Sequence, residues 1–370
     1  RINNTSRMKI DTNSRISLSN NDAGTDNTVF GFLAGAALAS GGVENTLVGD
    51  YAGTAITTGD YNTAIGKDAL KTDDVGRNST AIGYSALLLQ NTATEGAVNN
   101  TGVGINVAAY NVTGTNNTWI GANAGLGASG QSNSYNTGVG AKSLYRITTG
   151  QFNQAFGYQS GEDLTTGGHN ALYGADSGAG ITTASGSVFI GSQAGTTPTT
   201  GNMNIGIGYG AMQGGVTTGD SNIAIGYNAG DALTSGAKNV FIGLNAGSAE
   251  DAGSNNIGIG PNALAVCNND TGANVAIGNS AGLLIVAGYS NTLVGNGAGS
   301  SLTSGLNNIL LGRNAQASAV GGTNQIVLGK DAAGHGDNIA VIGNTSCTAW
   351  HPADDNGVAL GSASYRFADV

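Results

Sequence analysis

Residues 222–230 read NIAIGYNAG, and variants of this phrase recur about every 17 residues along the chain. The common form is Asn-x-x-(Ile/Val/Phe)-Gly-x-x-Ala, which is also clear at residues 62–69. A fixed period of this length is typical of stacked-repeat proteins, in which each unit contacts only its neighbours. The repeat therefore predicts one elongated all-β solenoid, where the length of 370 residues alone would suggest two or three globular domains.

The residues before each repeat glycine have the pattern of a short β-strand. The residue directly before the glycine is large and apolar, as in Ile65 and Ile225, and the residue two positions earlier is mostly β-branched. Alternate residues of a strand share one face, and β-branched residues favour strands. We expect these two positions to face the core of the coil. The small residue between them, such as Ala64 or Ala224, is then expected on the other face, where another chain could approach closely.

Three aromatic residues replace the small residue of the repeat. They are Trp119, Phe189 and Phe241. We interpret them as side chains that pack at a contact between subunits, with a lateral binding site as the alternative.

Asparagine, glycine and alanine complete the repeat. One asparagine per turn can stack into a ladder in which each side chain bonds the next. The glycine suits a tight turn with positive φ or a close approach of two backbones. The small residue three positions later fits the interior of a thin coil. The residues that represent these structural positions are Asn62, Ile65, Gly66, Ala69, Asn222, Ile225, Gly226 and Ala229.

The remainder of each repeat is polar and contains turn signals. Thr-Thr-Gly recurs there, for example at residues 148–150 and 165–167, and predicts loops on the outer face. The longest repeat carries its extra residues at 90–99, where a solenoid tolerates an insertion.

Composition argues against several classes of function. The net charge of −10 offers no basic patch for nucleic acid, and no long apolar stretch predicts membrane insertion. The two cysteines, Cys267 and Cys347, have no metal-site spacing and are expected to be free thiols. The Gly-x-Gly matches lie inside repeats and lack the rest of a phosphate loop. We therefore expect no enzyme activity and no cofactor.

Acidic pairs and histidines give the remaining candidates for chemistry. Paired carboxylates can hydrolyse glycosides, but we interpret these pairs as solvated loop charges. The pairs are Asp73–Asp74, Glu250–Asp251 and Asp354–Asp355. The three histidines are scattered, which argues against a metal site within one chain. In a trimer, His335 or His351 could still bind an ion on the axis.

The repeats at residues 62–66 and 222–230 resemble those of bacteriophage tail-fibre proteins, and they are also similar to repeats in the head domains of trimeric autotransporter adhesins. The resemblance covers roughly residues 27–345 and implies a parallel homotrimer, which we expect to be built from left-handed β-rolls. With roughly 20 rungs at about 4.8 Å each, the shaft would be on the order of 95 Å long. We favour separate rolls, with three chains wound into one shared β-helix as the alternative.

The C-terminal sequence favours the phage family. Residues 358–370 resemble a segment that, in tail fibres and tailspikes, precedes a self-cleaving intramolecular chaperone of the endosialidase type. The resemblance therefore implies a chaperone that has been removed or lies beyond this sequence. We divide the chain into a lead-in at residues 1–26, a repeat shaft at 27–345 and a C-terminal transition at 346–370.

These features predict a structural tail fibre of a virion that takes part in host-cell attachment. Its expected partners are further copies of itself, other tail proteins and a glycan or protein receptor on the host. The alternatives are a bacterial surface adhesin, a monomeric ice- or surface-binding solenoid with Thr-Thr-Gly rows as its hydroxyl array, and a polysaccharide depolymerase. An aromatic cluster near the C-terminus is either a cap over the last rung, which we favour, or a receptor contact. It contains Trp350, His351, Tyr365 and Phe367.

Overall fold

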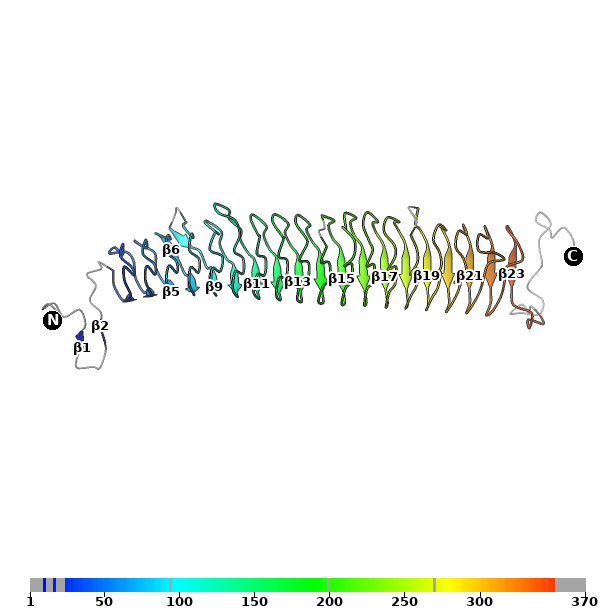
Figure 1. The fold of residues 1–370 in the computed structure, drawn as a ribbon, viewed down its shortest axis with the longest axis horizontal. Helices are drawn as coiled ribbons and strands as arrows, with labels where there is room; N and C mark the ends of the chain where they lie inside the picture. The colour runs from blue at the N-terminus through cyan, green and yellow to red at the C-terminus, as the bar shows by residue number, and fades with distance from the viewer. Residues whose placement is uncertain are drawn as a thin grey trace, which may run out of the picture.

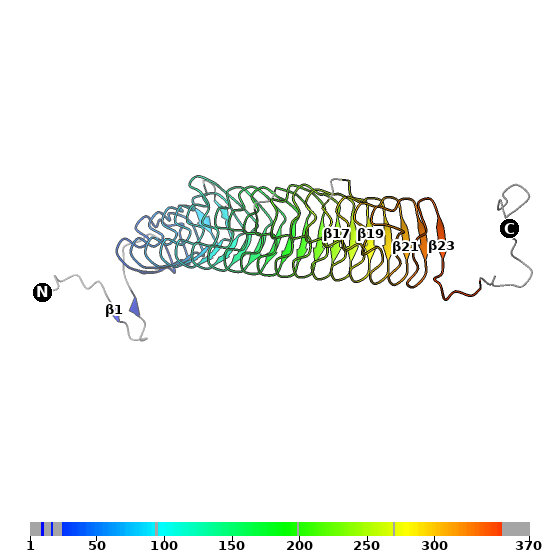
Figure 2. The ribbon, with the colours of Figure 1, turned by 45° about the vertical axis from the view of Figure 1, so that its right-hand side comes forward.

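The computed structural model describes residues 9–10, 16–17, 24–92, 95–197, 200–268 and 271–349. The predicted all-β solenoid is confirmed, because the chain winds into a long rod of similar coils that each contribute one short strand (Figure 1, Figure 2). The predicted lead-in and the C-terminal transition lie largely outside the described residues. Within the lead-in, β1 (Lys9–Ile10) and β2 (Ile16–Ser17) form an antiparallel pair.

One parallel sheet runs along the whole rod. Each of its strands is hydrogen-bonded to the strands of the coils before and after it. Besides β1 and β2, the described strands β6 (Gly76–Arg77) and β8 (Gly96–Ala97) stand apart from this sheet, as a small parallel pair. The strands of the long sheet are β3 (Thr28–Phe30), β4 (Thr46–Val48), β5 (Thr63–Ile65), β7 (Thr80–Ile82), β9 (Thr101–Val103), β10 (Thr118–Ile120), β11 (Thr137–Val139), β12 (Gln154–Phe156), β13 (Ala171–Tyr173), β14 (Val188–Ile190), β15 (Ile205–Ile207), β16 (Ile223–Ile225), β17 (Val240–Ile242), β18 (Ile257–Ile259), β19 (Val275–Ile277), β20 (Thr292–Val294), β21 (Ile309–Leu311), β22 (Ile326–Leu328) and β23 (Ala340–Ile342).

The register places equivalent residues of successive repeats directly beside one another. In β15 and β16, for example, Ile205 pairs with Ile223 and Ile207 pairs with Ile225. The glycine after each strand allows this close stacking. Gly226 has a φ of +139°, and a Cβ atom there would lie 2.5 Å from the carbonyl oxygen of Gly243 in the next coil. The predicted requirement for glycine is therefore confirmed.

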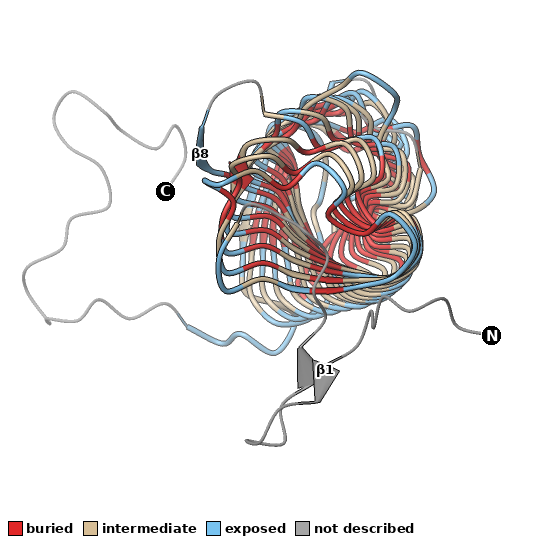
Figure 3. Ribbon diagram, turned by 90° about the vertical axis from the view of Figure 1, so that its left-hand side faces the viewer, coloured by how far each residue is buried: buried red, intermediate tan, exposed pale blue. Residues whose placement is uncertain are grey.

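The predicted direction of the strand faces is wrong. The middle residue of each strand points into the coil, so Ala64 is fully buried, whereas Ile65 is 37% exposed. Trp119, Phe189 and Phe241 occupy the same middle position and are also buried, so in this chain they are core residues and do not lie at a surface. Figure 3 shows the buried segments lining the inside of the coil. A period of two indicates which residues share a face, but it does not say which face is inside.

The core is filled by a size exchange between two positions of each repeat. In most coils whose middle strand residue is large, the position six residues later is glycine, as for Trp119 with Gly125 and Phe241 with Gly247. A Cβ atom on Gly125 would lie 2.5 Å from the Trp119 ring, so the two positions share one space. Where the strand residue is small, the later position can hold the large side chain, as at Gly258 with the buried Leu264. Other coils, such as that of Ala224 and Gly230, have a small residue at both positions, so each coil holds at most one large buried side chain at these two positions.

The predicted asparagine ladder is present along the inner side of the sheet. At Asn239 the side-chain Nδ2 donates to the carbonyl oxygen of Gly253, at 2.8 Å, and to Oδ1 of Asn222, at 3.1 Å. Its own Oδ1 accepts from the backbone N–H of Asn256 at 2.8 Å. All these asparagines are buried. The ladder therefore satisfies backbone groups of two neighbouring coils that would otherwise lack a partner away from water.

The ladder gives a direct test of what holds the coils together. We expect Asn239→Ala to lower the free energy of unfolding by roughly 2–5 kcal/mol, because it leaves the Gly253 carbonyl and the Asn256 N–H buried without this partner. The exposed Asn296, changed to alanine, serves as the control and is expected to change stability by less than about 0.5 kcal/mol. Urea unfolding followed by circular dichroism measures both. Equal effects would contradict the structural role of the ladder.

The size exchange predicts a compensating pair of substitutions. Phe241→Ala should destabilise the chain by roughly 3–5 kcal/mol because it opens a cavity. Adding Gly247→Leu should recover part of this loss, because leucine at the equivalent Leu264 already adopts a φ of 51°, close to the 58° of Gly247. Gly247→Leu alone should be destabilising, since its side chain would overlap Phe241. Thermal unfolding of the three variants checks this, and a double variant no more stable than Phe241→Ala would refute the exchange.

Candidate functional surface

The outward side of the long sheet is a continuous surface that follows the rod. It consists of the first and third residues of each strand from β3 to β23, which we call the outer stripe. These side chains are half-buried or exposed, including Ile120, Ile190 and Leu311 at about two-fifths exposure. None of them is charged. The alternation of residues placed these side chains in the core and so did not reveal this surface, although the exchange of size between the middle strand residue and the later glycine in many repeats was a signal for the true inner face.

Stacked aromatic rings interrupt the outer stripe near its middle. Phe156 and Tyr173 lie with ring centroids 4.9 Å apart and planes inclined by 5°, and the Tyr173 hydroxyl lies 2.7 Å from Oε1 of Gln154. Beside them, Phe152 stacks between Tyr135 and His169 at 4.8 and 4.9 Å. Phe152 has a neighbouring ring on each of its faces, so it offers only its edge to solvent. A sugar stacks on an open ring face, which this ring does not provide.

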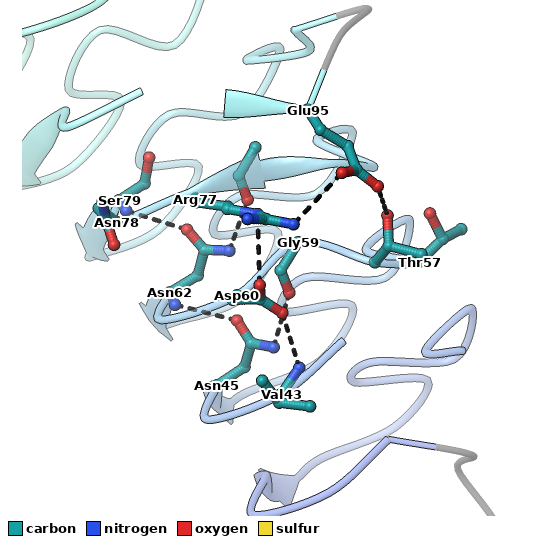
Figure 4. A network of polar contacts seen from close by, with 12 residues as sticks. Val43, Asn45, Thr57, Gly59, Asp60, Asn62, Arg77, Asn78, Ser79 and Glu95 are labelled. Atoms are coloured by element: carbon teal, nitrogen blue, oxygen red, sulfur yellow. Dashed lines mark hydrogen bonds and ion pairs between the residues drawn. The ribbon is translucent and has the colours of Figure 1, made fainter. Parts of the chain in front are cut away.

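The insertion at residues 90–99 is fixed to the coils before it by charged side chains. Figure 4 shows Arg77 between two carboxylates, with its Nε 3.2 Å from Oδ2 of Asp60 and an Nη 3.3 Å from Oε2 of Glu95. Asp60 also accepts the backbone N–H of Val43, and Glu95 accepts the hydroxyl of Thr58. The prediction that the insertion lies on the outside holds for β8, which is exposed, whereas Gln90 and Val98 at its two ends are buried. The carboxylates of Asp60 and Glu95 both form hydrogen bonds or ion pairs with neighbouring coils. We therefore interpret this cluster as a structural link between coils.

Two of the predicted loop acids are buried, which corrects their interpretation as solvated charges. Asp73 accepts hydrogen bonds from Gln90 and from the backbone N–H of Gly76, and burial raises the pKa of its carboxyl despite these bonds. Gln90 also bonds Ser79 and Asn100, and Ser79 stands where other repeats have the ladder asparagine. Glu250 accepts from Gly253 and Asn256. Asp73, through Gln90, and Glu250 therefore provide hydrogen-bond partners for residues at the ladder position, namely Ser79 and Asn256.

The remaining predicted sites are not brought together. His169 lies in the aromatic stack, His335 is exposed, and no group of three possible metal ligands occurs among the described residues. Both cysteines are free thiols as predicted, with Cys267 buried and Cys347 exposed. Burial, with Glu250 nearby, raises the pKa of the Cys267 thiol. The predicted tip residues Trp350, His351, Tyr365 and Phe367, and the pair Asp354–Asp355, lie outside the described residues.

The Thr-Thr-Gly loops form regular rows, but many of their hydroxyls are engaged. In the loops that the structure describes in full, the first threonine donates to a backbone carbonyl of the next coil, as from Thr148 to Thr165 at 3.0 Å and from Thr165 to Thr182 at 3.1 Å. The second threonine is exposed at Thr149 and Thr166, whereas the hydroxyl of Thr58 donates to Glu95 and that of Thr218 to the Thr234 carbonyl. These rows therefore serve in part to join the coils.

Comparison with known proteins gives no assignment. No protein-family model matches the chain, and no curated protein matches it. In the part of the chain that the structure describes, no helix is long and apolar enough to span a bilayer.

The buried carboxyl of Asp73 predicts a pH dependence of stability. Its folded-state pKa is raised above the ordinary value of 3.8, so the folded state binds the proton more tightly than the unfolded state. This contribution to stability is present below about pH 4 and is lost as the pH rises through the folded-state pKa. We therefore expect Asp73→Asn to gain stability relative to the wild type between pH 4 and pH 7, as measured by urea unfolding. A difference that is the same at every pH would report only altered hydrogen bonds and would contradict the effect of charge.

Proposed function

We propose that this chain forms the rigid shaft of a phage tail fibre, as a parallel homotrimer without enzymatic activity, and that it contributes to host-cell attachment. The observation that carries the proposal is the outer stripe, an apolar and uncharged face that runs along the rod. The resemblance of the repeats to tail-fibre sequences supplies the biological setting. We further propose that it acts on the virion surface, outside the cell.

The size of the outer stripe supports assembly from several copies. With about 4.8 Å between neighbouring strands, the sheet from β3 to β23 is roughly 85 Å long, and its two exposed columns are about 10 Å wide with their side chains. This corresponds to roughly 850 Å² of uncharged surface, of which about three quarters, or roughly 650 Å², is apolar, which is at or above the 300–600 Å² of the largest apolar patch on a typical monomer. Covering such a face removes apolar surface from water, which stabilises an assembly.

A parallel arrangement fits the repeat along the rod. In two copies that run in the same direction, equivalent strands can lie at the same height over the whole length. This is possible because the distance between neighbouring strands is the same in both copies. The three-fold symmetry and the left-handed coiling come from the resemblance. Since successive strands of one chain pair with each other, separate rolls are the form that we propose.

Attachment through a shaft of this kind would depend on reach and on several weak contacts. Three copies per fibre and several fibres per particle raise the effective concentration of each contact, so no deep pocket is required. The partners that we propose are the same chain, other tail proteins and a glycan or protein receptor on the host. The net charge of −10 gives no support to nucleic acid as a partner.

A bacterial surface adhesin of the trimeric autotransporter type is the second candidate, because its repeats are similar and it would use the same assembly. An ice- or surface-binding solenoid has less support. In the Thr-Thr-Gly loops that the structure describes in full, the first hydroxyl is engaged in joining the coils, which leaves only part of the array free.

The native mass tests the proposal. We expect sedimentation equilibrium to give about three times 36.4 kDa, and we expect the trimer to resist detergent on a gel until it is heated. A monomer of 36.4 kDa at all concentrations would refute the trimeric shaft and favour an isolated surface-binding solenoid. Incubation with host cells then distinguishes a fibre from a purely structural rod, because a fibre that attaches should bind them and compete with intact phage.

A further inference from the structure

The outer stripe is not uniform along the rod. In every strand of the long sheet from β3 to β11 the first residue is threonine, and in β14–β22 it is isoleucine or valine with the single exception of Thr292. The third residue is mostly isoleucine, valine or leucine in both halves. The stripe therefore has a threonine half and an aliphatic half, which are separated by Gln154 in β12 and Ala171 in β13.

The two halves differ in what they gain from contact with another surface. In the aliphatic half, two neighbouring columns of branched side chains can lose water together, as at Ile257 and Ile259 of β18. In the threonine half, one column carries hydroxyl groups, as at Thr80 of β7. A buried hydroxyl gains little unless it finds a hydrogen-bond partner, because it gives up its bonds to water. The aliphatic half therefore has the larger driving force for association.

The surroundings of the aliphatic half favour a second copy as its occupant. Its columns carry no charge, so two copies can meet there without repulsion. Its side chains repeat at the spacing of a parallel sheet, about 4.8 Å, and a surface with the same spacing is available on another copy of the same chain. Arg313 and Lys330, which follow β21 and β22, both lie within ion-pair distance of Asp331. The exposed Lys238 lies two residues before β17, outside the two columns.

We infer that copies of this chain associate mainly through the aliphatic half of the outer stripe, β14–β22, and that the threonine half contributes little to the affinity. This inference rests on the proposed assembly and adds to it the segment that holds the copies together.

Two lysine substitutions at equivalent positions test this inference. Ile257 and Thr80 are both first residues of a strand, both are half-buried, and both lie between two neighbouring strands. Ile257→Lys places like charges between the copies in the aliphatic half, so we expect dissociation at protein concentrations at least roughly a hundredfold higher than for the wild type. Thr80→Lys is expected to leave the dissociation concentration within about threefold of the wild type. A dilution series by sedimentation equilibrium measures all three proteins.

The outcomes separate this inference from the proposed function. If the wild type assembles but Thr80→Lys weakens association as much as Ile257→Lys, the inference is wrong and the shaft proposal stands. An Ile257→Lys variant that dissociates at the same protein concentration as the wild type would also overturn the inference. A wild type that stays monomeric contradicts the proposed function itself.

A fold control accompanies the mass measurement. Cys267 is buried in the coil that follows β18, so a thiol reagent should react with the exposed Cys347 alone as long as this coil is intact. If Cys267 becomes reactive in Ile257→Lys, the coil has been disturbed, and association is then measured for Ile257→Thr instead. Threonine is compatible with the fold at this position, because Thr80 occupies the equivalent position in β7. We expect Ile257→Thr to weaken association roughly tenfold. Association equal to that of the wild type would overturn the inference.

Discussion

The whole structure depends on the fixed height of one coil above the next. Backbone hydrogen bonds between parallel strands set this height, and the buried asparagine ladder repeats it on the inner side of the sheet. An asparagine side chain can accept from one coil and donate to another, which a hydrophobic residue cannot do. Where serine replaces it at Ser79, Gln90 reaches in from another part of the coil and supplies the missing amide. The protein thus conserves the bonding pattern even where it changes the residue.

The fixed height leaves a narrow interior, and this limits what can be buried. The space between the sheet and the opposite wall holds small residues such as Ala69 and Ala229 together with few large side chains per coil, for example Leu144 and Ile147. The exchange of Phe241 with Gly247 and of Gly258 with Leu264 follows from this limit. The branched residues on the other side of each strand, such as Ile65, therefore cannot be buried within the coil and lie on its outer surface. The outer stripe is therefore a consequence of a thin coil in which both sides of the strands are apolar.

Much of the architecture could be predicted from the sequence. The period, the three-residue strand before Gly66 or Gly226, the inward Ala69 and the ladder of Asn62 each follow from local chemistry that repeats. The direction of the strand faces could not be taken from the period alone. Size was a misleading guide, because the larger residue, Ile65, lies outside and the smaller Ala64 lies inside. Asp73 and Glu250 were misjudged for a related reason, since their hydrogen-bond partners come from other coils and no local pattern reveals them.

A solenoid of this kind has contacts only between neighbouring coils, so its stability is close to a sum of local terms. One weak coil can therefore open while distant coils remain folded. The proposed contact along the outer stripe would change this situation, because a second copy would touch many coils at once and opening one coil would also break contacts between copies. Lateral assembly would thus give a thin rod the long-range cooperativity that its own topology lacks. This is a physical reason for a shaft with an apolar outer side, and it accounts for why such residues are placed where a single chain leaves them in water.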